Sequence, residues 1–287
     1  MANLGILLAL GCALATNIGF LCKHRGAVVA APVEFRHPLR SAGALFRSRW
    51  FAIGWGIAFF GWALHVAALA LAPLSVVQTV ISGGLVLLAY PAERWFGLKL
   101  GRREWAGLIL SAVGLALLAA TSVGVHQDAG SSYSTTGMII FESAAVIAGV
   151  LLLLSGTVGP RAHCAIVLGS ATGILIGVSD VALKALAETV PGDPLSILSP
   201  WAAVAILAGL GGFFSLARGL QTGAAIPVIT LTSVAANCSA ILGGVLVFGD
   251  PIGGDTLSVI ARIAAFTAVI GAAALMPAPL RAAGARS

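Results

Sequence analysis

Charge is scarce in this chain. Only 9% of its 287 residues are Asp, Glu, Lys or Arg, while 59% are hydrophobic. A composition so poor in charge excludes an ordinary soluble domain and is typical of a polytopic membrane protein. Cysteine is also rare: Cys12, Cys22, Cys164 and Cys238 show no CxxC spacing, so they indicate packing positions rather than a disulfide framework or a metal cluster.

Motifs of catalysis are missing as well. There is no Gly-rich phosphate loop before a Lys-Ser/Thr pair, no metal-spaced His/Glu pair and no recognisable nucleophile motif. We therefore predict neither an enzyme nor a cofactor. The pI is near 9.7, but the basic residues are spread over short loops without interleaved aromatic residues. This pattern favours anionic lipid head groups on the cytoplasmic side as partners over nucleic acid.

Long apolar runs are abundant. Nine of them, each about 17 to 25 residues long, are sufficient to cross a hydrocarbon core of about 30 Å as helices. They occupy residues 3–22, 51–71, 74–91, 105–122, 137–156, 164–187, 200–217, 224–248 and 257–276. A backbone in lipid must satisfy its own hydrogen bonds, and the runs are too long and too uniformly apolar for barrel strands. The predicted fold class is therefore all-α, with nine transmembrane helices.

Basic residues lie in every second gap between these runs. Fourteen of the 16 Lys and Arg residues fall in alternate gaps, and the other two, Lys184 and Arg262, lie within helices. Positive loops are retained in the cytoplasm, so we predict a multi-pass protein of the cell inner membrane with its N-terminus outside and its C-terminus cytoplasmic. Ala13-Leu14-Ala15 resembles a signal cleavage site, but six basic residues follow the first run and none precedes it, so we expect an uncleaved helix.

The longest gap covers residues 23 to 50. Its last part, SAGALFRSRW, is predicted either as a short amphipathic helix on the inner leaflet or as an irregular basic loop. In the first case Leu45, Phe46 and Trp50 would lie in lipid, and Arg47 and Arg49 at the head groups.

Two trios of runs, the second to fourth and the seventh to ninth, follow the same plan. Each has a pair joined by a very tight turn, at residues 72–73 and 221–223, and a Gly-rich middle, at residues 82–84 and 243–244. The trios are offset by five helices, an odd number, so the second is inverted relative to the first. An inverted repeat indicates alternating access around a site near the repeat interface. Tandem packing of ordinary helices is the alternative.

The stretch ALALAPLSVVQTVISGGLVLLAYPAERWFGLKLGRREWAGLILSAVGLALL resembles the drug/metabolite transporter superfamily, as does RGLQTGAAIPVITLTSVAANCSAILGGVLVFGD in the second half. The nine runs, the KHRG sequence after the first, and a four-helix half (residues 1–122) before a five-helix half (residues 137–277) are similar to the NIPA-like magnesium transporter branch. That branch typically carries Glu at the position of Trp62 and an acidic residue near Leu98. Asp250 keeps an acidic residue at the matching place in the second half.

Ionisable residues within membrane helices cost about 2.5 to 3.5 kcal/mol each on insertion scales, so each requires a reason. The predicted topology places most of those in this chain toward the outer side, as an outward-facing vestibule would require. Together with polar residues in the same helices, they form the candidate solute or ion pathway: Glu142, Asp180, Lys184, His65, Gln78, Asn237 and Arg262.

Asp180 and Lys184 are four residues apart and share a helix face, either as a pair that neutralises itself in lipid or as one that responds to a proton or cation. Glu142 has no opposite charge within four positions. If it is buried it is a candidate proton carrier, and the alternative is that it reaches the outer interface. Glu142 and Asp180 are also the predicted metal ligands.

The remaining candidates have two interpretations each. His65, Gln78 and Asn237 either bind solute or form hydrogen bonds between helices. Arg262 either extends its charge to the outer interface or pairs with Glu142 or an anionic substrate.

Three functions fit these observations. The first is a NIPA-like carrier of a divalent cation, which would pass inward through Glu142 and Asp180, since magnesium sites prefer carboxylates with retained waters. The second is a proton-coupled exporter of a small organic solute, and the third is a membrane scaffold without transport. The substrate, the direction of transport, the coupling ion and the oligomeric state, a homodimer included, stay open.

Overall fold

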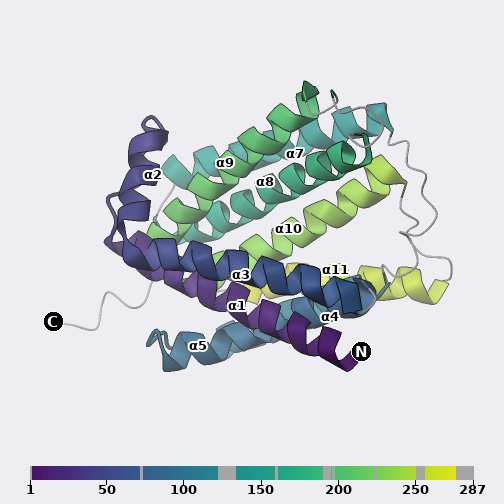
Figure 1. Cartoon of the computed structure of the whole chain (residues 1–287), viewed down its shortest axis with the longest axis horizontal. Helices are drawn as coiled ribbons and strands as arrows, with labels where there is room; N and C mark the ends of the chain where they lie inside the picture. The colour runs from purple at the N-terminus through teal and green to yellow at the C-terminus, as the bar shows by residue number, and fades with distance from the viewer. Residues whose placement is uncertain are drawn as a thin grey trace.

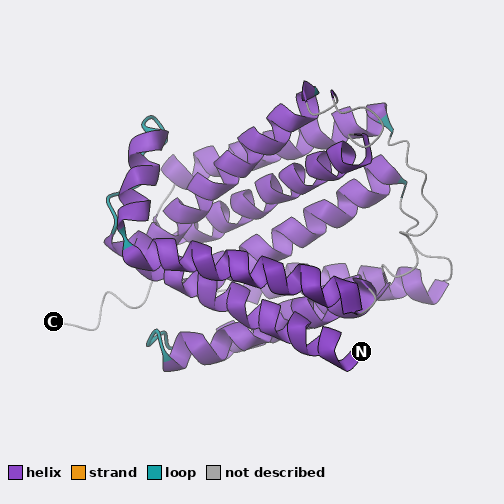
Figure 2. Cartoon of the chain, viewed as in Figure 1, coloured by secondary structure: helices purple, strands orange, loops and turns teal. Residues whose placement is uncertain are grey.

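The protein is described here from a computed structural model that covers residues 2–71, 74–121, 134–158, 161–189, 195, 198–222, 225–249 and 256–275. These residues are helical or lie in short connections, and no strand occurs among them (Figure 2). The all-α prediction is therefore confirmed for this part of the chain.

Helices follow the predicted apolar runs closely. In chain order the elements are α1 (Ala2–Val29), α2 (Pro38–Arg47), α3 (Arg49–Leu71), α4 (Leu74–Gly83), the 3₁₀ segment η1 (Gly84–Leu88), α5 (Ala89–Arg94), α6 (Arg102–Thr121), α7 (Thr135–Val158), α8 (Arg161–Thr189), α9 (Pro200–Thr222), α10 (Ala225–Phe248) and α11 (Thr256–Leu275). The third predicted run is interrupted, because α4 changes to a tighter 3₁₀ turn at Gly84 before α5 continues it.

Six of the described helices are long and apolar enough to cross a membrane. They run over Asn3–Val29, Arg49–Ala68, Thr135–Gly156, His163–Leu186, Pro200–Gln221 and Ala225–Phe248. The protein is thus a multi-pass membrane protein, with six such spans rather than nine by this measure. The segment from α4 to α5 falls short in part because η1 divides it into shorter helices.

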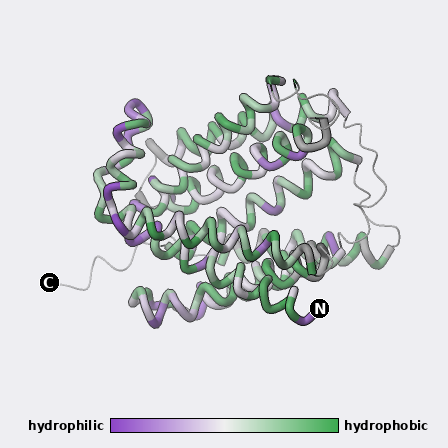
Figure 3. Tube along the Cα trace, viewed as in Figure 1, coloured by the Kyte–Doolittle hydropathy of each residue, from purple (hydrophilic) through white to green (hydrophobic). Residues whose placement is uncertain are grey.

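The end of α1 lies with α2 and α5 at one end of the bundle, on the left in Figure 1, and all three segments carry basic residues. Arg25 lies over the ring of Trp50 at 4.3 Å, and the Trp50 ring lies 6.5 Å from that of Phe96, so three basic segments of the chain meet there. Figure 3 shows hydrophilic residues concentrated along α2 at the same end. We call this the basic end. The sequence predicts that the basic residues of alternate gaps lie on one side of the membrane, and in these segments they lie at one end of the bundle.

Helix directions alternate along the chain. In the pair α7 and α8, Gly149 lies against Leu175 and Gly156 against Leu168, so contacts run in opposite directions and the helices are antiparallel. In the pair α8 and α10, Gly169 lies against Val228 and Gly177 against Ser239, so these two helices are parallel. This is the packing expected of a chain that crosses back and forth.

Two close contacts between small residues, each between a pair of parallel helices, organise the bundle. A Cβ atom built on Gly84 of the α4 run would clash with Cβ of Ala13 on α1, and one built on Gly173 of α8 would lie 2.5 Å from Cβ of Ala235 on α10. Gly84 and Ala235 each stand ten residues after the first residue of their helical run. Small residues let helix backbones approach closely where lipid provides no hydrophobic drive for association.

The last helix does not pack mainly with its sequence neighbours. α11 lies chiefly against α6, and a Cβ atom on Gly114 of α6 would lie 3.0 Å from the Ala265 carbonyl oxygen of α11. α8 is the central helix of the second half, with α7, α9 and α10 around it.

The amphipathic helix predicted near residue 45 is present, as α2, but one of its predicted contacts is wrong. Leu45 is 0% exposed and belongs to the protein core instead of lipid. The reason is that α2 packs on α3 and faces α9: the Phe46 ring lies 5.3 Å from that of Phe51 and 6.2 Å from that of Phe213. These aromatic contacts direct the adjacent Leu45 inward.

The close contact at Gly173 predicts opposite effects for two glycine-to-alanine changes. Gly173→Ala should lower the free energy of unfolding by about 1 to 3 kcal/mol, because the added methyl meets helix α10 backbone atoms. Gly56→Ala, at a position on α3 where a Cβ meets nothing within 4 Å, should raise it by up to about 1 kcal/mol because alanine favours helix. Denaturant unfolding in detergent measures both. Equal stability of the two variants would contradict the packing described here.

Candidate functional site

Glu142 on α7 is buried without a partner. Its side chain is 3% exposed, and neither carboxyl oxygen has a hydrogen-bond partner among the described residues. The neighbouring Phe141 belongs to an apolar cluster that includes Met138 and Val181. The predicted alternative, in which Glu142 extends to the outer interface, is not what the structure shows.

Helix register shows what Glu142 faces. Glu142, Gly149 and Gly156 are spaced seven apart, which keeps them on one face of a helix, and the two glycines contact α8 at Leu175 and Leu168. Extending the same antiparallel register puts Glu142 opposite Ala182, which is 0% exposed. Glu142 is therefore inside the second half, between α7 and α8.

Asp180 and Lys184 lie at a similar depth on the other side of α8. Asp180 and Lys184 come seven residues after Gly173 and Gly177, so they share a face of α8 with these two glycines, which both contact α10. Asp180 is exposed and forms no hydrogen bond or ion pair with another described residue, so the predicted pair with Lys184 is not formed. The ammonium of Lys184 instead lies 3.9 Å from the ring centroid of Phe248 on α10, an interaction favoured in apolar surroundings.

The exposed part of α8 around Asp180 also includes Leu183, which lies three residues further along the same face and is 52% exposed. Around the axis of α8, Asp180 lies between the side that contacts α9, where Ser179 donates to the Ala205 carbonyl at 2.9 Å, and the side that contacts α10. α1 packs on both α9 and α10. Asp180 thus lies on the face of α8 between α9 and α10, away from Glu142.

His65 and Gln78 belong to the first half. His65 is half-buried on α3 and Gln78 lies on α4, where its side chain is outside the described residues, as is the turn at residues 72–73 between them. Trp62, one turn before His65, is 59% exposed and lies 5.6 Å from the ring of Phe59. It therefore belongs to the outer surface of α3.

Asn237 and Arg262 both make hydrogen bonds to helix backbone. Asn237 donates to the Ser233 carbonyl of its own helix at 2.8 Å, rather than between helices. Arg262 is 6% exposed, and its guanidinium donates to the carbonyl of Thr121 at 2.6 Å. A cation at the last carbonyls of a helix satisfies them and interacts well with the helix dipole. The bond to Thr121 gives Arg262 a role at the end of α6 that was not predicted; extension to the outer interface and pairing with Glu142 or an anionic substrate stay predictions.

Two buried polar residues of α1 were absent from the predicted pathway. Asn17, 5% exposed, donates to the Gly84 carbonyl at 2.9 Å, where the helix becomes 3₁₀. Lys23, 6% exposed, has its ammonium 4.3 Å from the ring centroid of Trp55. α1 continues to Val29 and so takes Lys23 into the bundle, whereas the sequence had placed it in a loop. Neither sequence segment by itself indicates the hydrogen bond between the Asn17 side chain and the Gly84 carbonyl.

The seven candidates therefore fall into separate places. Glu142, Asp180 and Lys184 share one depth of the second half, His65 and Gln78 lie on α3 and α4, Asn237 on α10, and Arg262 between α11 and α6. No group of three or more His, Cys, Asp or Glu side chains suited to a metal ion occurs among the described residues. Asp250 lies outside them.

The chain is similar to one curated plant protein over most of its length. It is 25% identical over 263 residues to a protein named "Probable magnesium transporter NIPA9" from Arabidopsis thaliana, and the match covers 85% of this chain and 73% of the relative. No family model matches the chain, and no solved structure matches it. The similarity extends over both predicted halves rather than over one helix pair.

The position of Arg262 predicts a structural effect of its removal. Arg262→Met should lower the free energy of unfolding by about 1.5 to 3 kcal/mol, because it leaves the Thr121 carbonyl at the end of α6 without its charged donor. Arg103→Met, at an exposed position of α6, is the matched control and should cost little. Denaturant unfolding in detergent compares them. An Arg262→Met protein as stable as the control would show that the guanidinium does not support α6.

Proposed function

We propose that the protein is a NIPA-like secondary transporter that moves magnesium across the cell inner membrane. The observation that carries this proposal is the similarity to a probable magnesium transporter over 85% of the chain, in a protein whose described helices include six apolar spans. Basic segments at one end of the bundle support a cytoplasmic location for that end.

The packing of the two halves supports an inverted repeat. α1 packs extensively on α3 and approaches the α4 run at Ala13 and Gly84; α8 packs extensively on α9 and approaches α10 at Gly173 and Ala235. The matching order of contacts is what two copies of one helix plan would produce. When the segment from α4 to α5, α6 and α11 are counted as spans, the total is nine. In this plan α6 and α11 occupy equivalent places in the two halves, and they pack against each other. Such repeats in transporters exchange access between the two sides of the membrane.

Asp180 is the carboxylate best placed to meet a cation. It is exposed, at a level near the end of the bundle opposite the basic end, and it lies on the face of α8 between α9 and α10. An exposed carboxylate can hold a hydrated magnesium ion, which keeps several of its waters. Glu142, sealed between α7 and α8, would respond to this site through α8 rather than by direct coordination.

A second candidate function is proton-coupled export of a small organic solute. The observation that favours it is the apolar surroundings of Glu142, because a carboxyl group without a hydrogen-bond partner in such surroundings holds a proton more readily than a metal ion. In that case Glu142 would carry the proton, and Asp180 would lie on the route of the solute.

Magnesium flux in liposomes with the purified protein tests the proposal. Asp180→Asn should reduce flux toward that of protein-free liposomes, because it removes the exposed negative charge but keeps the shape of the side chain. Glu142→Gln should reduce magnesium flux less than Asp180→Asn does. If a proton gradient drives the flux, the two variants should reduce it to a similar extent. Glu93→Gln, an exposed carboxylate at the basic end that accepts from the Leu100 amide, is the matched control and should leave flux unchanged.

One result would contradict the proposed mechanism, and another would contradict magnesium as the substrate. Flux that survives Asp180→Asn and Glu142→Gln together would remove both carboxylates from the mechanism. A proton gradient that drives a solute panel but no magnesium would favour the exporter instead.

A further inference from the structure

Two buried hydroxyl groups in the core have no hydrogen-bond partner. Ser111 of α6 and Thr230 of α10 are both 0% exposed, and neither hydroxyl oxygen bonds to any described residue. Other fully buried hydroxyls are satisfied: Thr172 and Ser215 both donate to the Leu168 carbonyl, at 2.7 and 3.0 Å. Burying a polar group without a hydrogen-bond partner costs free energy. The burial of the Ser111 and Thr230 hydroxyls is therefore best explained by a second conformation in which they have partners.

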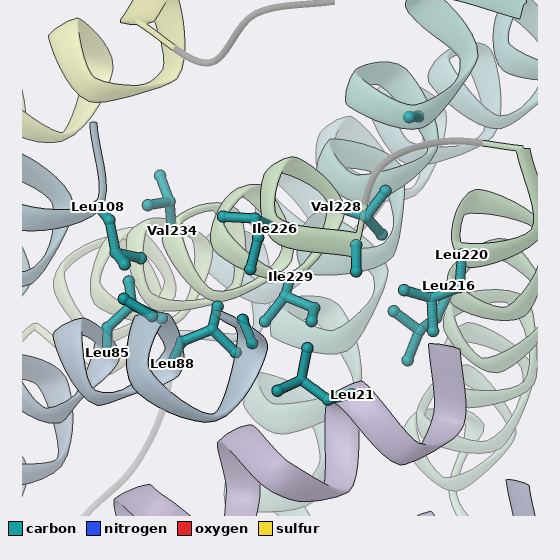
Figure 4. Packing of buried hydrophobic residues seen from close by; sticks show 14 of the residues in the cluster. Leu21, Leu85, Leu88, Leu108, Leu216, Leu220, Ile226, Val228, Ile229 and Val234 are labelled. Carbon is teal, nitrogen blue, oxygen red and sulfur yellow. The ribbon is translucent and has the colours of Figure 1, made fainter. Parts of the chain in front are cut away.

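Both hydroxyls lie at the seam between the two predicted halves. Thr230 shares a face of α10 with Ile226 and Val234, four residues away on either side, and Ser111 lies between Leu108 and Leu115 on α6. These four apolar residues belong to one buried cluster, and α6 packs on α10. Figure 4 shows Leu108 of α6 beside Val234 of α10.

The cluster seals the seam with side chains from two more elements, α1 and η1. Ile229 of α10 points toward Leu88 of η1 and Leu21 of α1 (Figure 4). We call the sealing set the apolar plug; it consists of Leu21, Leu88, Leu108, Ile226, Ile229 and Val234. Its helices end or begin at the basic end, so the plug lies in that half of the bundle.

A set of polar contacts ties the two halves together beyond the plug. The side-chain amide of Gln221, at the end of α9, donates to the carbonyls of Ala27 and Ala31 at 3.1 and 3.0 Å and accepts from the amide of Val33 at 3.0 Å. His24 Nδ1 lies 3.1 Å from the Leu220 carbonyl. We call His24 and Gln221 the latch. It joins α1 of the first half to α9 of the second.

We propose that Ser111 and Thr230 line the basic-end half of the transport path, which the apolar plug and the latch hold shut in this structure. The proposal rests on the transport function proposed above. When the halves separate at this end, the two hydroxyls gain water or the water shell of a magnesium ion, which retains its waters. Their lack of partners is then a property of the closed state, and the latch sets how often the path opens.

Cysteine accessibility tests the proposal without any transport measurement. Ser111→Cys and Thr230→Cys are made in a background with Cys12, Cys22, Cys164 and Cys238 replaced by alanine, each with an intact latch and with Gln221→Leu. A membrane-impermeant thiol reagent is applied to sealed vesicles of known orientation. Thr172→Cys is the matched control, since Thr172 is equally buried but satisfied within the second half.

With the latch intact, both cysteines should react slowly. With Gln221→Leu they should react about tenfold faster and only from the basic end, because three hydrogen bonds that favour closure are lost. Thr172→Cys should stay protected in both. Hydrogen exchange on the full chain with its native cysteines gives a second reading: amides around Thr230 should exchange faster in Gln221→Leu, and those around Glu142 should not.

Three results would overturn the proposal. They are unchanged reactivity of both cysteines in a folded Gln221→Leu protein, equal gain at Thr172→Cys, and reaction from the end opposite the basic end. If the cysteines are labelled as expected but the protein moves no magnesium, magnesium is contradicted as the substrate and the proposed path is supported. Magnesium flux with both cysteines unresponsive would keep the substrate and remove the path.

Discussion

Close parallel packing of small residues is the constraint on which the rest of this structure depends. Lipid tails are as apolar as leucine, so helices in a membrane associate through van der Waals contact and hydrogen bonds rather than through exclusion of water. The contacts Ala13 with Gly84 and Gly173 with Ala235 provide that approach once in each half. The first also brings Asn17 within reach of the Gly84 carbonyl, where the α4 run changes to a 3₁₀ turn.

Buried polar groups divide into two classes. Asn17 and Arg262 satisfy backbone groups of another element, as does the partly buried Gln221, and they hold the arrangement in place. Glu142, Ser111 and Thr230 are buried with no partner among the described residues. Since burial without a partner is costly, groups of the second class are the ones expected to change surroundings during a transport cycle. They lie in different parts of the bundle, Glu142 toward one end and the hydroxyls toward the basic end.

Much of the fold followed from hydropathy and charge alone. The nine apolar runs coincide with described helical segments, and two of the basic gaps, at residues 23–50 and 92–104, meet at one end through Arg25, Trp50 and Phe96. The site was predicted less well. Arg262 caps a helix and Lys184 lies over Phe248, because both side chains found partners on helices more than sixty residues away in sequence. No periodicity within one helix carries that information.

The sequence by itself determined the class of protein, and it predicted where the helices lie and which segments carry positive charge, because these depend on the solvation of each segment in lipid or water. The tertiary structure decided which polar residues face which. Glu142 and Asp180 lie at one depth but on opposite sides of α8, and Ser111 and Thr230 lie on the faces of α6 and α10 that contribute to one apolar cluster between the halves. Helix rotation and partner choice depend on side-chain packing across the whole bundle, which is a non-local property.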